Sequence, residues 1–333
     1  MLSGRRAIED LVDFAVKSRT RVLFVQVYRA NKAWFASSVA DSEPYRGCLR
    51  SVGEDPMALL IRKAHAAGIE VHAWFNLLSL STNEDAPILK KYGSAVLTRN
   101  SAPKKSVADY KIDNQYFLEP GDVRVQKTLE RVVTEAVRAY PGLDGVQFDY
   151  IRYPDVHPAY GHTKANVSLF KKETGERRVA EDNPAWKRWK YGRVTALVRR
   201  LRHAARAIHP GLQVSTTGLM PYSRASLESH QDWKFWLDSG LVDFVTLMCY
   251  TRDMEAFEKY LKDAQKRTGR LQRVNIAVGA YKLHDDPAMF ERQFAACEEA
   301  APRGCVVLDY GDLVENPALA GSFLDPHTSS VKK

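Results

Sequence analysis

Cysteine is scarce in this chain of 333 residues, which contains only Cys48, Cys249, Cys297 and Cys305. No two of them have the C-x-x-C spacing of a zinc ligand pair, and no histidines cluster around them. This pattern argues against a zinc site and leaves the redox compartment open. We therefore predict no metal and no cofactor.

Long apolar runs are also absent. No run approaches the roughly 20 apolar residues that a membrane-spanning helix needs. Residues 1–10 lack the apolar core of a secretory signal. We predict no integral membrane segment and, for the chain as written, a cytoplasmic protein.

Motifs for binding phosphate or nucleic acid are missing as well. The residues after the last two expected strands form no glycine-rich phosphate loop, which counts against an aldolase or isomerase of phosphorylated sugars. The net charge of +9 favours anionic partners. However, much of the excess positive charge lies on one expected helix whose apolar residues have regular helical spacing. No aromatic side chains accompany it on which nucleic-acid bases could stack, so we interpret this charge as the solvated outer face of the helix. We predict no nucleic-acid partner; the arginines concerned are Arg193, Arg199, Arg200, Arg202 and Arg206.

The chain does have a regular alternation of expected strands and helices. Such alternation predicts a parallel sheet with helical crossovers, and the length suits one (β/α)8 TIM-type barrel. We expect helices at residues 5–17, 56–67, 123–140, 233–237, 256–267 and 288–300, besides the arginine-rich helix. We expect strands at residues 21–28, 69–76, 144–153, 213–219, 244–250, 274–280 and 305–310.

These expected strands are one short of the eight that close a barrel of this class. Because the first expected element is a helix, we expect the first strand to lie upstream of Met1. The seam between strands 21–28 and 305–310 should then be open. Alternatively, residues 116–119 supply the eighth strand. We expect a single domain at residues 1–321 and a frayed tail at 322–333.

The most informative stretch runs from Asp144 to Pro154 and reads DGVQFDYIRYP. A short apolar run ends in charged and aromatic residues, as a buried parallel strand does when its C-terminal end opens into an active site. Alternation places Gln147, Asp149 and Ile151 on one face, and the more apolar set Val146, Phe148 and Tyr150 on the other, outer face. We therefore expect Asp149 to point into the barrel mouth and Pro154 to end the strand.

The inward faces of the expected strands are too polar for a simple packed core. They indicate a hydrogen-bonding pocket with aromatic walls, which suits a polysaccharide or oligosaccharide substrate. We expect His72 to be a core residue. We expect Arg29 and Arg152 either to hold a substrate carboxylate or to fix the position of Asp149. The sequence leaves the oligomeric state open. The expected substrate-binding residues are Tyr28, Arg29, Trp74, Asn76, Arg152, Tyr250 and Tyr281.

Several segments, in this order, resemble the glycosyl-hydrolase-like TIM barrels of family ten. They are FVQVYRANKAWF, VHAWFN, YFLEPGDVRV, DGVQFDYIRYP, QDWKFWLDSGLVDFVTLMCY and VGAYK, and they span roughly residues 5–312. That family is related to a divisome glycosidase of denuded peptidoglycan and to hydrolase domains that process poly-β-1,6-N-acetylglucosamine. The resemblance implies a glycoside hydrolase of an amino-sugar-containing envelope polysaccharide or peptidoglycan glycan.

The resemblance also bears on the N-terminus. Members of the family begin with a strand before the first helix and are exported, so a truncated N-terminus would make the protein extracytoplasmic. A more distant similarity to chitinase-like barrels covers Asp144, Asp149 and the strand end Met248-Cys249-Tyr250. Gln147 and Ile151 depart from that pattern, so the chitinase mechanism does not carry over.

Glycoside hydrolysis normally needs two carboxyl groups. We expect Asp149 to be the first, and either Asp309 or Glu119 to be the second. Both of these have a structural alternative: Asp309 as a partner of Tyr28 or an arginine, and Glu119 as a helix cap. The alternative function is a carbohydrate-binding barrel without turnover.

Overall fold

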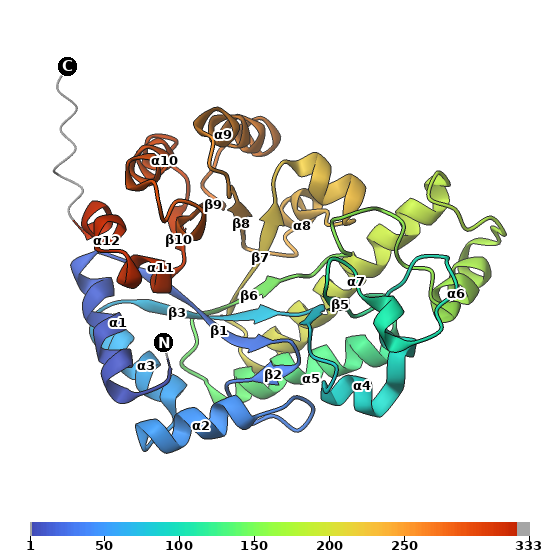
Figure 1. Cartoon of the computed structure of the whole chain (residues 1–333), viewed down its shortest axis with the longest axis horizontal. Helices are drawn as coiled ribbons and strands as arrows, with labels where there is room; N and C mark the ends of the chain where they lie inside the picture. The colour runs from blue at the N-terminus through green and yellow to red at the C-terminus, as the bar shows by residue number, and fades with distance from the viewer. Residues whose placement is uncertain (1, 325–333) are drawn as a thin grey trace.

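Within the described residues, 2–324, seven parallel strands form one strongly curled, TIM-barrel-like sheet in this computed structural model (Figure 1). Its order is β10-β9-β8-β7-β6-β3-β1, and the short antiparallel β2 (Lys32–Ala33) continues it beyond β1. The predicted fold class is confirmed, and each expected strand occurs. The parallel strands are β1 (Val22–Arg29), β3 (Glu70–Asn76), β6 (Gly145–Asp149), β7 (Gln213–Leu219), β8 (Phe244–Met248), β9 (Val274–Gly279) and β10 (Gly304–Leu308).

Helices from the connections between the strands cover the outside of this sheet and bury its apolar outer face. Most of them begin at an aspartate or asparagine whose side chain accepts an amide hydrogen bond of the first turn. Asp55, Asp122, Asn183, Asp253 and Asp286 act in this way. The helices are α1 (Arg5–Lys17), α3 (Pro56–Ala66), α5 (Val123–Ala139), α7 (Pro184–Ile208), α8 (Trp233–Asp238), α9 (Met254–Thr268) and α10 (Pro287–Glu299).

Shorter elements fill the connections, mostly on the side where the strands end. The alternative assignment of residues 116–119 to the barrel is wrong, because β5 (Tyr116–Phe117) pairs antiparallel with β4 (Ser79–Ser81) in a separate sheet. The other elements are α2 (Glu43–Val52), α4 (Pro87–Tyr92), α6 (Lys164–Thr174), α11 (Tyr310–Glu315), α12 (Pro317–Leu324), η1 (Gly93–Val96), η2 (Val107–Tyr110), η3 (Arg224–Glu228) and η4 (Ala280–Lys282).

The two outermost parallel strands, β1 and β10, are not paired with each other in the described part of the chain. The open seam predicted from the strand count is therefore present. β2 lies on the free side of β1 but pairs only with Tyr28 and Arg29. Residues 22–26 of β1 consequently keep a free edge.

A disulfide between Cys297 and Cys305 joins α10 to β10. At the end of the described chain, α12 continues through Leu324, so the tail expected from residue 322 begins as helix. The remainder of that tail, residues 325–333, lies outside the described residues. None of the described helices is both long and apolar enough to cross a membrane.

Candidate active site

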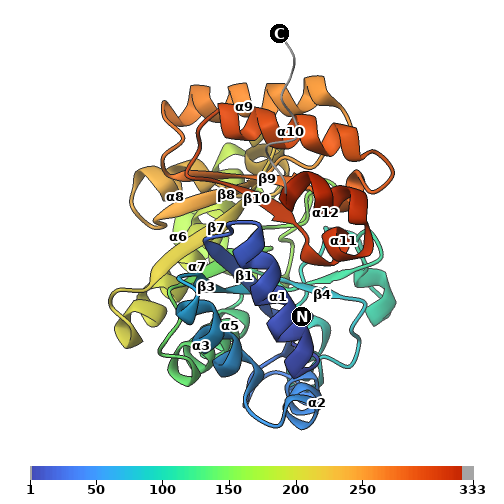
Figure 2. The ribbon, with the colours of Figure 1, turned by 90° about the vertical axis from the view of Figure 1, so that its left-hand side faces the viewer.

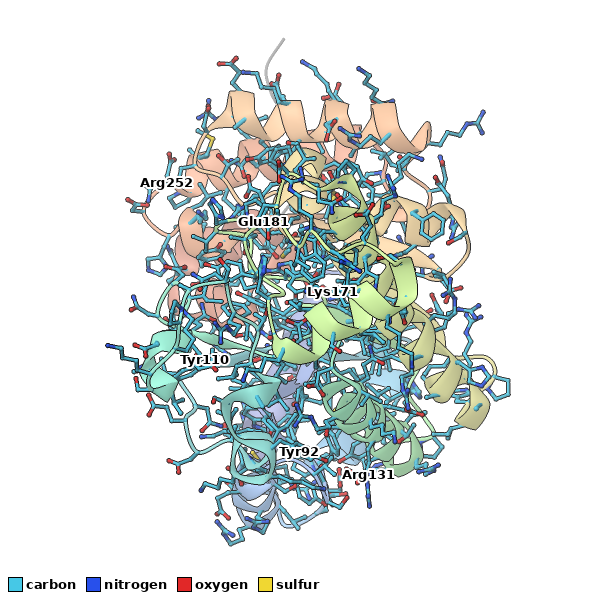
Figure 3. All side chains as sticks on the ribbon, turned by 90° about the vertical axis from the view of Figure 1, so that its right-hand side faces the viewer. Tyr92, Tyr110, Arg131, Lys171, Glu181 and Arg252 are labelled. Carbon is cyan, nitrogen blue, oxygen red and sulfur yellow. A yellow bond between two sulfur atoms is a disulfide. The ribbon has the colours of Figure 1, made fainter. Side chains whose placement is uncertain are left out.

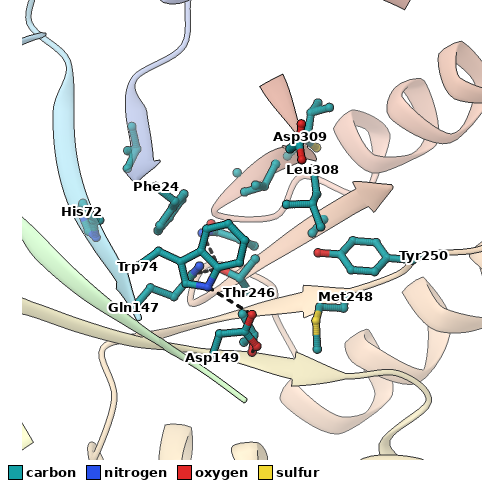
Figure 4. Close-up of a pocket in the computed structure, with 18 of the residues that line it drawn as sticks. Phe24, His72, Trp74, Gln147, Asp149, Thr246, Met248, Tyr250, Leu308 and Asp309 are labelled. Carbon is teal, nitrogen blue, oxygen red and sulfur yellow. Dashed lines mark hydrogen bonds between the residues drawn. The ribbon is translucent and has the colours of Figure 1, made fainter. Parts of the chain in front are cut away.

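The C-terminal ends of the parallel strands open into one large cavity of about 1570 Å³ (Figure 4). Parallel strands all end on the same face, so the residues at their tips come together there. The cavity also continues down the seam between β1 and β10. Strand ends contribute Asn76, Asp149, Thr217, Met248, Tyr250 and Asp309 to its lining.

Asp149 is buried in the wall of this cavity, and within residues 2–324 its carboxylate has four hydrogen-bond donors around it. Its Oδ1 accepts from the Tyr150 amide at 2.7 Å and from the Thr217 hydroxyl at 2.6 Å. Its Oδ2 accepts from the indole N–H of Trp74 at 3.1 Å, and the Arg152 guanidinium lies 3.4 Å from Oδ1. Figure 4 shows Trp74 beside the carboxylate. These donors fix the carboxylate in one orientation as an acceptor.

Strand register and an early strand end produce this arrangement. Asn76 pairs with Asp149 across β3 and β6, which makes Trp74 the diagonal neighbour of Asp149. The strand ends at Asp149, earlier than expected, because Tyr150 has a left-handed φ of 49°. Tyr150 was expected on the outer face, but it lines the cavity, with the Arg152 guanidinium 4.1 Å from its ring centre.

The loop after β6, which carries Arg152, is anchored away from the cavity. The buried Lys190 of α7 donates to the carbonyls of Pro158 and Tyr160, at 2.8 and 3.1 Å, and to Glu181 at 2.8 Å. Glu181 lies in the segment between α6 and α7 (Figure 3). A buried ammonium with three acceptors anchors this loop at residues 158 and 160.

The floor of the cavity has hydrogen-bonded polar side chains and, below them, a cluster of aromatic rings. Thr246 donates to Gln147 at 2.8 Å and accepts from Asn275 at 3.3 Å. Lower down, the rings of Phe24, His72 and Phe244 pack against one another. Burial lowers the pKa of His72, which keeps it neutral, as suits the core residue predicted. Among the described residues, no group of His, Cys, Asp or Glu is arranged to hold a metal ion.

Aromatic side chains form the upper walls. Tyr250 and Tyr281 meet edge to face at 5.6 Å, and Phe117 stacks on Tyr150 at 6.3 Å. Burial, followed by the negative charge of Asp149, raises the pKa of Tyr250, so its hydroxyl keeps the proton and remains a donor.

Two polar side chains of the walls, Asn76 and Arg29, differ in burial. The buried Asn76 lines the cavity, and its Oδ1 accepts no hydrogen bond within residues 2–324. Arg29 lies exposed at the rim of the same cavity.

Tyr28 and Glu119, two of the predicted site residues, are not among those that line the cavity. The pairing of β1 with β3 shifts between Gln26 and Tyr28, and this bulge breaks the alternation that would have turned Tyr28 inward. Tyr28 is instead fully buried and accepts a hydrogen bond from Asn31 at 3.0 Å.

Glu119 is also fully buried, behind the loop that carries Arg152. Its Oε1 accepts from the Tyr153 hydroxyl at 2.6 Å and from the Gly121 amide at 3.2 Å. It does not cap α5, because Asp122 does. Burial raises the pKa of Glu119.

Two further carboxylates line the cavity. Asp309 is exposed at the end of β10 and caps α11, with its Oδ1 accepting from the Asp312 amide at 3.2 Å. Asp155 was not foreseen; it lies just beyond the DGVQFDYIRYP motif and pairs with Arg224 of η3 at 2.5 Å. Its place in the loop that follows β6, on the side where the strands end, was the signal available in the sequence.

A family profile described as glycosyl hydrolase-like 10 matches residues 4–294. That match covers most of the chain. The chain belongs to the glycosyl hydrolase-like 10 family.

Relatives of this family member carry hydrolase names. One is the glycosyl hydrolase DigH of Escherichia coli K12, which is 24% identical over 344 residues, covering 96% of this chain and 75% of DigH. Another is the glycosyl hydrolase YngK of Bacillus subtilis, which is 21% identical, covering 92% of this chain and 63% of YngK.

Solved glycosidases share the fold. A β-galactosidase from Marinomonas ef1 has a TM-score of 0.61 at 11% identity, and the match covers 92% of this chain but 52%, about half, of that enzyme. An endo-β-1,4-mannanase from Thermotoga petrophila has a TM-score of 0.55 at 12% identity, covering 100% of this chain and 76% of the mannanase. At this identity, the likeness concerns the barrel architecture alone.

Proposed function

We propose that this protein hydrolyses the glycosidic bonds of an amino-sugar-containing envelope glycan, such as the glycan strands of peptidoglycan, at the mouth of its barrel. The observation that carries the proposal is the fixed carboxylate of Asp149. It lies at a strand end, has four hydrogen-bond donors around it within residues 2–324 and borders a cavity with aromatic walls. Family membership and the names of the relatives support hydrolysis as the reaction class.

Three carboxyl groups are assigned different roles. Because four hydrogen-bond donors hold the Asp149 carboxylate, it acts as the nucleophile or as the charge that stabilises the anomeric centre. Asp309 lines the same cavity and keeps its Oδ2 free of the helix cap, so it is the proton donor. Glu119 assists from behind the site, through Tyr153 and the loop that carries Arg152.

The walls provide the sugar subsite. Trp74, Tyr250 and Tyr281 offer ring faces and edges to the apolar faces of the sugar. The free Oδ1 of Asn76 accepts from a sugar hydroxyl, which would satisfy this buried oxygen. The Tyr250 hydroxyl donates to an acetamido carbonyl, and Arg29 at the rim pairs with a lactyl or uronic carboxylate.

Asp149→Asn tests the central assignment. The change keeps the shape of the side chain but removes its charge, so turnover should fall by more than the ~10²–10⁴-fold expected for one acid-base group. Release of fragments from chitin oligosaccharides and from peptide-free peptidoglycan strands is measured by mass spectrometry. Binding of the same oligosaccharides should be largely retained.

Two variants of Trp74 are the matched controls. Trp74→Phe keeps a ring for stacking but loses the donor to Asp149, so turnover should fall more than affinity. Trp74→Ala loses both and should weaken binding as well. Full turnover in Asp149→Asn would rule out the assignment. Glycan binding by the parent protein without any turnover would instead favour a carbohydrate-binding barrel.

A further inference from the structure

Tyr150, the residue that follows Asp149, has a backbone conformation that tyrosine rarely adopts. Its φ of 49° lies in the left-handed region, which is free of strain for glycine but not for a residue with a side chain. Hydrogen bonds hold this conformation: the Tyr150 amide donates to Asp149, and the Tyr150 carbonyl accepts from the Leu78 amide at 3.3 Å. Strained residues of this kind occur mainly at functional sites, so a tyrosine here indicates a role for its ring.

The side chain of Tyr150 is fixed by its ring and keeps its polar end free. Phe117 stacks on the ring at 6.3 Å, and the Arg152 guanidinium lies 4.1 Å from the ring centre. The residue is only half-buried in the cavity wall, and its hydroxyl makes no hydrogen bond within residues 2–324. This hydroxyl is therefore available to a ligand as both donor and acceptor.

A ribbon formed by β4, β5 and the turn at residues 112–115 supplies the wall next to Tyr150. Every second residue of its last stretch, Asp113, Gln115 and Phe117, lines the cavity. Between them, Tyr116 is fully buried and donates to Glu84 at 2.7 Å. Such alternation directs one set of side chains of an extended segment to the same side, which here is the side of the cavity.

The ribbon is held at its base and at its tip. At the base, the Leu77 amide donates to the carbonyl of the last residue of β6 at 2.9 Å, and the Leu118 amide donates to the Leu78 carbonyl at 2.8 Å. At the tip, Ile112 and Gln115 exchange two backbone hydrogen bonds, at 2.8 and 3.0 Å. Figure 1 shows β5 beyond the end of β6, at the mouth of the barrel. The side chains of the ribbon thus have defined positions beside the strand end that carries Asp149.

The polar groups of the ribbon are free to bind a ligand. Ser79 donates to Oε1 of Gln115 at 2.9 Å, which orients the amide, while the side-chain NH₂ of Gln115 has no partner in the described chain. Asp113 is exposed, and its carboxylate has no cationic partner within residues 2–324. A free amide donor, a free carboxylate and a free phenol match the hydroxyl and acetamido groups of a neutral sugar, whereas Asp113 would repel a carboxylate.

We propose that Tyr150, Gln115 and Asp113 form a second sugar subsite, which binds a neutral ring of the substrate beside the subsite at Asp149. This inference rests on the proposed function, which provides the sugar at the first subsite. The two subsites meet at Tyr150, whose amide contacts Asp149 and whose ring contacts Phe117 of the ribbon. The protein therefore distinguishes an oligosaccharide, which reaches both subsites, from a single sugar, which fills only the first.

Binding of N-acetylglucosamine and of its β-1,4-linked trisaccharide, measured by NMR titration, tests the second subsite. Gln115→Glu keeps the acceptor for Ser79 but removes the free amide donor, and Tyr150→Phe keeps the ring but removes the hydroxyl. Each change should weaken binding of the trisaccharide by about three- to tenfold, the value of one hydrogen bond. Binding of the monosaccharide should stay within about twofold of that of the parent, because it does not depend on these groups.

Two further variants calibrate the measurement. Trp74→Ala alters the first subsite and should weaken binding of both sugars. Asn114→Gly is the matched control on the ribbon: Asn114 is exposed, does not line the cavity, and has a φ of 57° that glycine adopts without strain. It should bind both sugars as the parent does.

The second subsite is ruled out if the parent binds the trisaccharide no more tightly than the monosaccharide, or not at all. It is also ruled out if Gln115→Glu and Tyr150→Phe leave trisaccharide binding unchanged or weaken both sugars equally. Should Tyr150→Phe melt well below the parent, Gln115→Glu alone decides. The proposed function is judged separately by fragment release: the expected binding pattern without any cleavage would retain the subsite and reject hydrolysis, and cleavage without this pattern would do the reverse.

Discussion

The hydroxyl of Thr217 makes the shortest of the hydrogen bonds to Asp149, at 2.6 Å. Thr217→Val keeps the branched shape in the buried strand and removes this donor. A hydrogen bond to a charged group is worth about 1.5–3 kcal/mol, so turnover should fall by roughly one to two orders of magnitude. Steady-state kinetics on the glycan cleaved by the parent protein measures the effect.

Thr217→Ser serves as the control for this prediction, because it keeps the hydroxyl and loses only a methyl group. It should retain most of the turnover while destabilising the fold slightly. Equal losses in the two variants would assign the effect to packing and would leave Thr217 without a role in holding Asp149.

Glu119 makes the stability of the protein depend on pH. Its side chain is fully buried, and burial disfavours the charged form of the carboxyl group. Burial raises the pKa of Glu119 above its ordinary value of 4.5, so the folded state binds the carboxyl proton more tightly than the unfolded chain. The resulting stabilisation is complete below pH 4.5 and is lost as the pH rises through the raised pKa.

Glu119→Gln isolates this contribution, because glutamine has the donor and acceptor of a protonated carboxyl group and does not titrate. Relative to the parent, the variant should become progressively more stable from about pH 5 to pH 8. Urea unfolding across this range gives the difference. If the difference in free energy of unfolding between the parent and the variant did not change with pH, the carboxyl group of Glu119 would have the same protonation in the folded and unfolded states across this range.

At the scale of elements, local chemistry accounts for what the sequence could predict. Apolar runs bounded by turns located the barrel strands, and a helix start such as Pro56 after Asp55 was readable because proline fits the first helical position. Asp149 was placed correctly at the mouth, since simple alternation holds along β6 as far as that residue.

The features that could not be predicted depend on single backbone events. A bulge after Gln26 turned Tyr28 away from the cavity, and the left-handed Tyr150 brought an unexpected ring into it. The burial of Glu119 depends on Tyr153, which is distant in sequence. Alternation and spacing do not determine such events, because tertiary contacts select them.

The disulfide between Cys297 and Cys305 ties the edge strand β10 to its neighbouring helix. Cys305→Ser should lower the free energy of unfolding by about 2–4 kcal/mol. A reductant should lower the melting temperature of the parent and leave that of the variant unchanged. Cys48→Ser is the control, because Cys48 is a free thiol. It should melt like the parent, with the same response to reductant.

For the whole molecule, the strand count carried more information than the composition. The positive net charge suggested anionic partners, yet Arg193, Arg200 and Arg206 of α7 each pair with a carboxylate on a neighbouring element. In contrast, the shortfall of one strand predicted the open seam. The net charge is the sum of many surface groups, most of which can pair locally, so it says little about the architecture. A closed barrel of this class has a fixed number of strands, so the number of expected strands does constrain the architecture.

The open seam has a consequence for the protein at high concentration. Its two edges have no strand partner in the described chain, but Phe14 of α1, Phe294 of α10 and Phe323 of α12 line the same space and pack on one another. Figure 2 shows α1 and α12 side by side near β1 and β10. Covering a sheet edge with helices is one way in which proteins keep unpaired backbone groups from joining a strand of another molecule. These three rings therefore guard the opening against the association that a bare edge would invite.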